Sequence, residues 1–142
     1  MARQLGVSDH CMFLGFRPDV PDLLACFDVF VLPSLWEGLS ISLLEALAAG
    51  SAIVTTNIKG NREVISSGED GVLVAPEDPR ALAEAVIGLL GDRSKRLEMG
   101  IRARAKAENC FSEDAMVRRT LEIYSGNWTA PMAQRRRIPK PS

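Results

Sequence analysis

Four short apolar runs alternate along the chain with segments whose apolar residues recur at helical spacing. The runs cover residues 11–14, 28–32, 52–56 and 71–75, and three of them are followed directly by a glycine or a proline. Runs of this length, separated by helical patterns, are typical of a parallel α/β sheet. Because the runs are continuously hydrophobic, we expect about four strands that flanking helices bury on both faces.

The segments between and after these runs carry helix signals. Ser40, Asp78, Asp92 and Ser112 stand where N-caps are expected, and Pro79 follows at a first helical position. Gly50 stands where a helix can end in a left-handed residue. We expect helices over residues 19–27, 40–49, 61–66, 78–91, 92–105 and 112–124.

The composition is that of one ordinary globular domain. The chain has 142 residues, 46% hydrophobic and 25% charged, which suffices for a core without metals or disulfides. Cys11, Cys26 and Cys110 are odd in number and far apart, so we expect reduced, mostly buried thiols. The sequence holds one histidine, His10, which excludes a histidine-rich metal cluster.

Charge divides the chain into an acidic body and a basic tail. Residues 1–126 hold thirteen basic and eighteen acidic residues, a net charge of −5, whereas residues 127–142 hold four basic residues and no acid. An acidic body argues against nucleic-acid binding. The proline-containing tail predicts disorder, with weak attraction to anionic lipid or an acidic partner as the alternative. Without a signal peptide or long apolar run, we expect a cytoplasmic protein.

Glu45 is the one ionisable side chain between residues 38 and 49, among leucines and alanines. A helix that is apolar all round should be buried, and a carboxylate buried with it is costly without hydrogen-bond donors. A neighbouring arginine is one source of donors. A ligand is the other, and sugar or ribose hydroxyls are suitable.

The segment before this helix predicts an anion site. The run at residues 28–32 leads through residues 33–40 into the helix, and such turns lie at the carboxyl end of a parallel sheet, where ligands bind. Gly38 permits close approach of the backbone. The free N–H groups at the helix start would bind a phosphate. These groups belong to Leu39, Ser40 and Ile41.

Two carboxylates flank this predicted anion site. Glu37 stands just outside it and would face a neutral hydroxylated group beside the phosphate. Glu45 would face a second such group further along the helix. Two acceptors around an anion site suit a nucleotide joined to a sugar.

These residues resemble a known family. Glu37 through Glu45 is similar to the Glu-x7-Glu motif of the retaining glycosyltransferases with two Rossmann-like domains, the GT-B fold, in group 1 (family 4). Further segments match in order: Phe13–Phe16, Asp19–Leu24, Gly60–Ile65, Gly71–Val74 and Asp78–Leu82. The resemblance implies that residues 1–126 are an incomplete, Rossmann-like C-terminal domain that binds a nucleotide-sugar, followed by the tail at residues 127–142.

The resemblance also implies residue roles. Glu37 would be the catalytic residue that contacts the donor sugar's hydroxyls, and Glu45 would hold the ribose. Backbone groups would bind the diphosphate at Gly38, Leu39, Ser40 and Ile41. The loop beside the nucleobase would comprise Gly15, Phe16 and Arg17. The donor would be a UDP-, GDP- or ADP-sugar, transferred with retention at the anomeric carbon and without a metal or other cofactor.

The sequence departs from the family in small and large ways. Leu39 and Ser40 stand where Phe and Gly are commoner. Family members also carry an N-terminal acceptor domain and a strand–helix unit whose Arg and Lys neutralise the leaving diphosphate, and residues 1–10 supply neither. We therefore expect an enzyme in the full-length protein and no activity in this chain alone. The alternatives are a non-catalytic module that binds nucleotide or a partner, and a GT-B epimerase, whose usual catalytic acids and histidine are not recognisable.

The missing strand–helix unit also affects the sheet. In the doubly wound order 3-2-1-4-5-6, residues 11–14 and 28–32 would be the third and fourth strands, with two further strands between them. The chain must pair these runs directly, leave the first outside the sheet, or borrow strands from a partner. We expect the nucleotide-sugar donor and the N-terminal acceptor domain as partners. Self-association, and association of the full enzyme with the inner face of a membrane, are left open.

Overall fold

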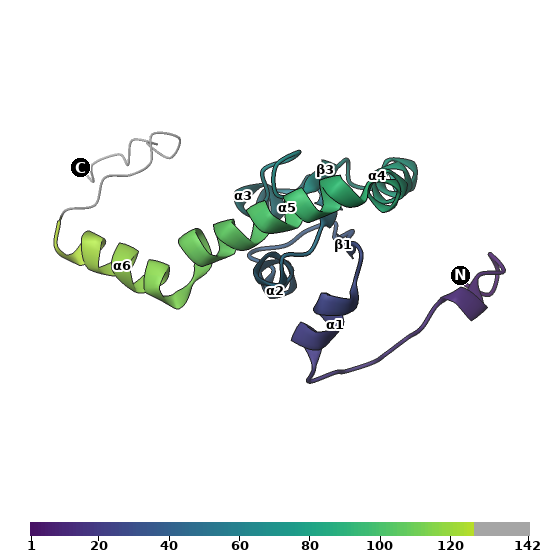
Figure 1. Ribbon diagram of the computed structural model, residues 1–142, viewed down its shortest axis with the longest axis horizontal. Helices are drawn as coiled ribbons and strands as arrows, with labels where there is room; N and C mark the ends of the chain where they lie inside the picture. The colour runs from purple at the N-terminus through teal and green to yellow at the C-terminus, as the bar shows by residue number, and fades with distance from the viewer. Residues whose placement is uncertain (127–142) are drawn as a thin grey trace, which may run out of the picture.

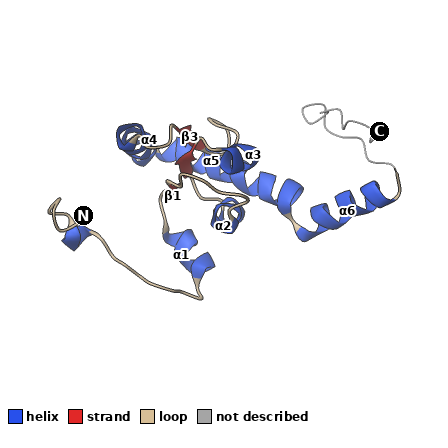
Figure 2. Cartoon of the chain, turned by 180° about the vertical axis from the view of Figure 1, so that it is seen from behind, coloured by secondary structure: helices blue, strands red, loops and turns tan. Residues whose placement is uncertain are grey.

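The computed structural model describes residues 1–126, which contain one sheet of three parallel strands in the order β1-β2-β3. The strands are β1 Phe30–Leu32, β2 Ile53–Thr56 and β3 Val72–Val74. Figure 2 shows this small sheet among the helices. All residues of β2 are buried, whereas β1 and β3 are partly exposed. Burial on both faces is therefore confirmed for the central strand, and the prediction is wrong for the outer two.

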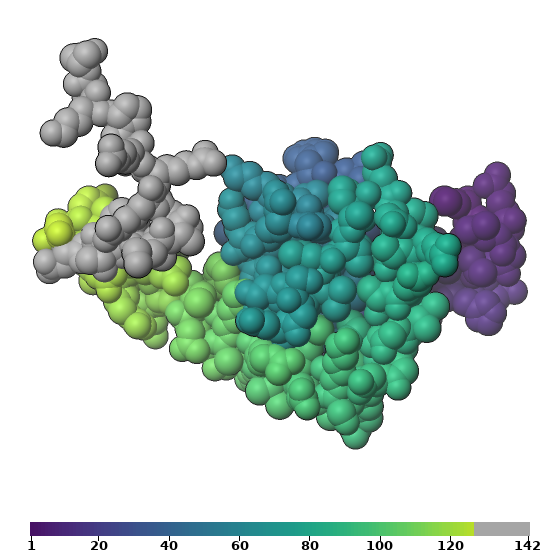
Figure 3. Space-filling model, turned by 90° about the horizontal axis from the view of Figure 1, so that it is seen from above, coloured from purple at the N-terminus to yellow at the C-terminus, as the bar shows by residue number. Residues whose placement is uncertain are grey.

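The predicted strand at residues 11–14 is wrong. These residues lie outside the sheet, in an arm that leads away from the rest of the molecule (Figures 1 and 3), and Met12 and Phe13 are 84% and 86% exposed. The described residues thus form three strands rather than about four. The reason is strand order, because the third position does not neighbour β1 and a strand without a neighbour has no backbone partner. The chain leaves this run outside the sheet.

In the described part of the chain, β1 is consequently an open edge of the sheet. Its backbone pairs with β2, where the N–H of Phe30 donates to the carbonyl of Ala52 at 2.8 Å. Successive residues of a strand direct their backbone groups to opposite sides, so the N–H and C=O of Val31 face away from β2. Such an edge is a template for pairing with another segment.

The predicted helices are confirmed, with bounds shifted by at most two residues. They are α1 Val20–Cys26, α2 Ile41–Ala49, α3 Lys59–Val64, α4 Pro79–Gly91, α5 Arg93–Lys106 and α6 Glu113–Tyr124. A 3-10 turn (η1, Ser8–His10) precedes them, and a π-helical turn (η2, Ala107–Phe111) joins α5 to α6. Figure 1 shows α5 running across the body and α6 projecting from it.

Three of the predicted N-caps form. The carboxylates of Asp78 and Asp92 and the hydroxyl of Ser112 accept backbone N–H groups at 2.9, 2.9 and 3.2 Å. Gly50 ends α2 at φ 72°, in the left-handed region as predicted. The fourth predicted cap is wrong: Ser40 stands at the N-cap of α2, but its hydroxyl caps no N–H and instead lies 3.0 Å from the hydroxyl of Ser42.

The core occupies both faces of β2. Ile53 and Val54 are fully buried and point to opposite faces. The cluster around Ile53 draws side chains from α2, α3 and α5, including Leu43, Leu47, Val64 and Ala103. The cluster around Val54 draws on β3, α4 and α5, including Val74, Leu89 and Met99. α5 therefore packs in both clusters and joins them.

The cysteines are free but less buried than expected. Cys11 and Cys26 are exposed and Cys110 is half-buried, so the prediction of mostly buried thiols is wrong. Cys11 belongs to the arm that leaves the core.

In residues 1–126, no helix is long and apolar enough to cross a membrane. The tail at residues 127–142, predicted to be disordered, lies outside the described residues.

Candidate functional site

The loop between β1 and α2, residues 33–40, lies at the carboxyl end of the sheet, as its position after β1 predicts. Pro33 and Leu35 of this loop line a cavity of about 170 Å³. Thr56 at the end of β2 and Val74 at the end of β3 line the same cavity. The carboxyl ends of all three strands thus meet beside the candidate site.

Hydrogen bonds from β2 hold the last residue of β1 and the loop that follows it. The hydroxyl of Thr55 donates to the carbonyl of Leu32 at 2.8 Å, and the hydroxyl of Thr56 donates to the carbonyl of Ser34 at 2.5 Å. The hydroxyl of Ser34 then donates to Oε1 of Glu37 at 2.8 Å. The half-buried carboxylate of Glu37 is therefore oriented by a chain of donors that begins in the central strand.

The start of α2 presents free N–H groups, and these extend two residues beyond the predicted set. The first intrahelical bond runs from the N–H of Leu44 to the carbonyl of Ser40, at 3.2 Å. The N–H groups without an intrahelical acceptor are those of Ser40, Ile41, Ser42 and Leu43. Ser40 and Ile41 belong to the predicted set, and the N–H group of the third predicted residue, Leu39, also has no hydrogen-bond acceptor among the described residues. Ser42 and Leu43 were missed because sequence patterns do not locate a helix end to the residue.

Glu45 is exposed, so the expectation of a buried carboxylate is wrong. α2 packs on the core through Leu43, Ala46 and Leu47, while Ile41 on its other side is 72% exposed. A short helix can therefore be almost wholly apolar and still present one side to solvent. Glu45 lies one turn after Ile41, on the side of α2 that begins at the free N–H of Ile41.

The predicted nucleobase loop stands apart from these groups. Gly15 has φ 63° and Phe16 is 96% exposed, both in the arm before α1. Arg17 donates to both carboxylate oxygens of Asp19, at 2.7 and 2.5 Å, which raises the pKa of Arg17 and lowers that of Asp19. Among residues 1–126, no hydrogen bond or ion pair joins residues 15–17 to Glu37–Ile41. By contrast, Gly38 and Leu39 directly follow Glu37 in the loop, and both are exposed.

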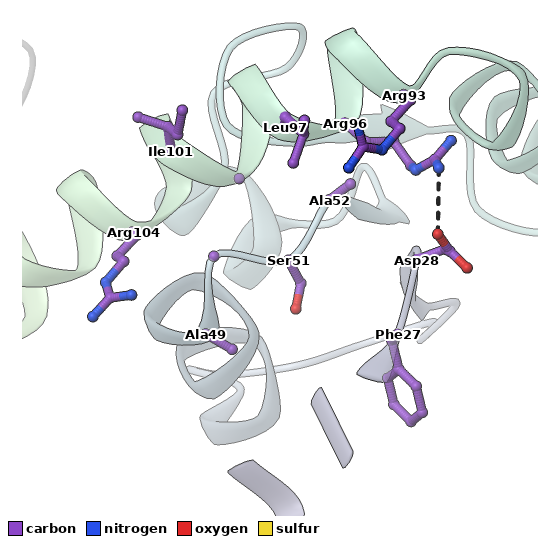
Figure 4. Close-up of a pocket in the computed structure, with 12 residues that line it drawn as sticks. Phe27, Asp28, Ala49, Ser51, Ala52, Arg93, Arg96, Leu97, Ile101 and Arg104 are labelled. Carbon is purple, nitrogen blue, oxygen red and sulfur yellow. Dashed lines mark hydrogen bonds and ion pairs between the residues drawn. The ribbon is translucent and has the colours of Figure 1, made fainter. Parts of the chain in front are cut away.

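A second, larger cavity of about 410 Å³ lies at the amino end of the sheet, between α5 and the residues that precede β1 and β2 (Figure 4). Arg96 lines this cavity, but its guanidinium is already hydrogen-bonded within the chain. It donates to the carbonyls of Leu89 and Leu90 at 2.6 and 2.7 Å and to the carboxylate of Asp28 at 3.3 Å. This cavity shares no lining residue with the cavity at the carboxyl end of the sheet, so it is separate from the candidate site. The part of the chain that the structure describes contains no group of three His, Cys, Asp or Glu side chains placed to hold a metal.

The strand order, the parallel pairing and the covering helices define a Rossmann-like α/β domain, present in part. A family model described as "Glycosyl transferases group 1" matches residues 1–106. The chain belongs to this family, which confirms the resemblance seen in its motifs.

Curated relatives share the same region. The chain is 32% identical over 120 residues to UDP-Gal:alpha-D-GlcNAc-diphosphoundecaprenol alpha-1,3-galactosyltransferase of Escherichia coli, covering 84% of the chain and 31% of the relative. It is 38% identical over 123 residues to spore coat protein SA of Bacillus subtilis (strain 168), covering 84% and 33%. The chain thus spans about a third of the length of these relatives.

Solved structures of the GT-B type share the fold. Anabaena Alr3699/HepE in complex with UDP superimposes with a TM-score of 0.83 and 27% identity, covering 88% of this chain and 35% of that one. The same protein in complex with UDP-glucose has a TM-score of 0.81, with the same identity and coverage. The described residues are therefore one part of a GT-B fold.

Proposed function

We propose that this chain is the donor-binding part of a retaining glycosyltransferase. The full-length protein would transfer a hexose from a UDP-, GDP- or ADP-sugar to an acceptor bound by an N-terminal domain. The observation that carries this proposal is the loop at residues 33–40, which β2 holds at the carboxyl end of the sheet with Glu37 oriented and the start of α2 free. The UDP and UDP-glucose complexes of a neighbour at 27% identity support it.

In this proposal the donor diphosphate binds at the start of α2. The free N–H groups there and the positive end of the helix dipole would stabilise its charge, without a metal. Glu37 would contact the sugar hydroxyls as the catalytic residue, and Glu45, one turn along the exposed side, would hold the ribose. The backbone of Gly38, Leu39 and Ser40 would lie against the phosphates. Gly15, Phe16 and Arg17 would reach the nucleobase when the arm packs on this face in the full-length protein.

The acceptor differs among relatives and is not carried over. One relative is named for a diphosphoundecaprenol-linked acceptor and another for L-malate. We place the full-length protein in the cytoplasm. If its acceptor is lipid-linked, the protein would act at the inner face of the membrane.

Calorimetric titration of the 142-residue chain with UDP, GDP and ADP tests the donor site. We expect binding that weakens about tenfold in Glu45→Gln, because the ribose hydroxyls lose a charged acceptor. Glu122→Gln, an exposed glutamate on α6, is the matched control and should leave the affinity unchanged. Absence of binding for all three nucleotides would contradict the proposal. Sugar transfer is then assayed with the N-terminal part of the protein added in trans.

A second candidate function, a non-catalytic partner-binding module, rests on the exposed face beside β1. Among residues 1–126 the edge of β1 is open, and Leu35 and Trp36, in the loop that follows β1, are 59% and 85% exposed. Light scattering across a concentration series distinguishes the two candidates. Self-association without nucleotide binding favours the module, whereas nucleotide binding by a monomer favours the donor site.

A further inference from the structure

The second residue of α3 touches the loop that carries Glu37. Gly60 is buried, and a Cβ placed on it would overlap the carbonyl oxygen of Gly38 and lie 2.6 Å from that of Glu37. Carbon and oxygen atoms do not approach this closely without a bond, so a side chain at residue 60 requires the loop to move. The closeness of α3 and the loop therefore depends on glycine at this position.

The next residue of α3, Asn61, is fully buried and acts on the same loop through two threonines. Its Nδ2 donates to the hydroxyl of Thr55 at 2.7 Å and to the carbonyl of Thr56 at 3.0 Å. The hydroxyls of these threonines donate in turn to the carbonyls of Leu32 and Ser34, at 2.8 and 2.5 Å. One residue of α3 thus contacts both threonines, of which Thr55 holds the end of β1 and Thr56 holds the loop.

The direction of these bonds is determined. A hydroxyl has one proton, and Thr55 uses it on the carbonyl of Leu32, so it meets Asn61 as an acceptor. A backbone carbonyl can only accept, so Thr56 also requires the nitrogen of the Asn61 amide. In the described residues, Oδ1 of Asn61 is buried without a hydrogen-bond partner, which lowers the stability of the fold. The amide nitrogen of the same side chain orients the two threonines.

We propose that Gly60 and Asn61 are positioning residues of the candidate site. Gly60 sets the distance between α3 and the Glu37–Gly38 peptide, and Asn61 orients the hydroxyls that hold Leu32 and Ser34. Ser34 then orients the carboxylate of Glu37. The loop's role in binding a donor rests on the proposed function, whereas the control of its position by α3 does not.

The test compares Gly60→Ala with Gly88→Ala in the 142-residue chain. Gly88 lies inside α4, and a Cβ there would meet no atom within 4 Å, so it is a matched control. We expect Gly60→Ala to shift the amide resonances of Gly38 and Leu39 in the absence of ligand and to weaken UDP binding about tenfold. Gly88→Ala should do neither. Unshifted Gly38 and Leu39 amides in a folded Gly60→Ala chain would overturn the proposal.

A second variant keeps the proposal testable if Gly60→Ala does not fold. Thr56→Val preserves the shape of this buried residue and removes the hydroxyl that holds Ser34. We expect faster amide hydrogen exchange in residues 34–38, with exchange in β3 unchanged, and equal exchange in both variant and wild type would count against the proposal. A wild-type chain that binds no UDP, GDP or ADP would contradict the proposed function, and the amide shifts would still decide the role of α3.

Discussion

The carboxylate of Asp70 lies 2.7 Å from the ammonium group of Lys106, in an ion pair that joins the segment before β3 to the last turn of α5. The side chain of Asp70 is 6% exposed, and its second oxygen accepts the N–H of Ser66 at 2.8 Å. Lys106 also donates to the hydroxyl of Ser66, at 3.0 Å. Because water has little access to Asp70, these donors take the place of water around its carboxylate.

Replacing Lys106 by methionine should therefore be costly. We expect Lys106→Met to lower the free energy of unfolding by about 3 kcal/mol, since it leaves a buried carboxylate without its cation. Lys95→Met, at an exposed position on the same helix, should change it by less than about 0.5 kcal/mol. Urea denaturation measures both, and equal effects would show that the ion pair does not stabilise the fold.

The contact between α2 and α5 gives a second prediction. A Cβ on Gly100 would overlap the carbonyl oxygen of Gly50, where the end of α2 meets α5. Gly100→Ala should cost about 2 kcal/mol of stability because the two helices must separate. Gly88→Ala should raise stability by up to about 1 kcal/mol, because alanine favours a helix and no neighbour obstructs it. Thermal unfolding distinguishes the two, and a stabilising Gly100→Ala would contradict the close helix contact.

Glu77 adopts φ 59°, a left-handed conformation that side chains disfavour, just before α4. Glu77→Gly should raise the free energy of unfolding by about 1 kcal/mol, because glycine adopts this conformation without a steric penalty. Glu77→Ala keeps a Cβ and should give no such gain. Chemical denaturation of the two variants provides the comparison, and identical stabilities would mean that this backbone is unstrained.

The ion pair between Arg17 and Asp19 predicts a pH effect. The guanidinium of Arg17 holds the pKa of Asp19 below its ordinary value of 3.8. The stabilisation is therefore complete above the unfolded-state pKa and is lost as the pH falls through the lower folded-state pKa. Titration of the Asp19 carboxyl carbon by NMR should show a midpoint that Arg17→Gln raises. An unchanged midpoint would show that the pair does not form in solution.

The thiols should differ in reactivity. Cys11 and Cys26 are exposed, whereas Cys110 lies half-buried in η2. A thiol reagent such as dithionitrobenzoate should therefore modify Cys11 and Cys26 faster than Cys110 in the native chain. Single Cys→Ser variants assign each phase, and a fast phase that survives loss of both Cys11 and Cys26 would contradict the burial of Cys110.

Local patterns predicted most of the secondary structure. The helices ended close to their predicted bounds because their caps act over a few residues, as Asp78 and Gly50 do. The run at residues 11–14 has the composition of a strand as well, but a strand needs a neighbour, and composition cannot show whether that neighbour is present. The same limit applies to Cys11, whose exposure follows from the position of that arm.

The candidate site was predicted only in outline. The motif from Glu37 to Glu45 located the loop and the helix start, because strand-to-helix turns lie at one end of a parallel sheet. The exposure of Glu45 was missed because hydropathy describes a helix and not the surface that it meets. Gly60 and Asn61 were not singled out as site residues, since their contacts cross from one βα unit to the next.

The sequence by itself determined the α/β class, the positions of the helices, the family and the loop that carries Glu37, because these depend on spacing and on residues close together in the chain. The tertiary structure decided which strands pair, which side of α2 faces solvent and how α3 holds the loop. These properties depend on contacts between distant segments, such as the approach of Gly60 to Gly38, and no local pattern encodes the distance between them.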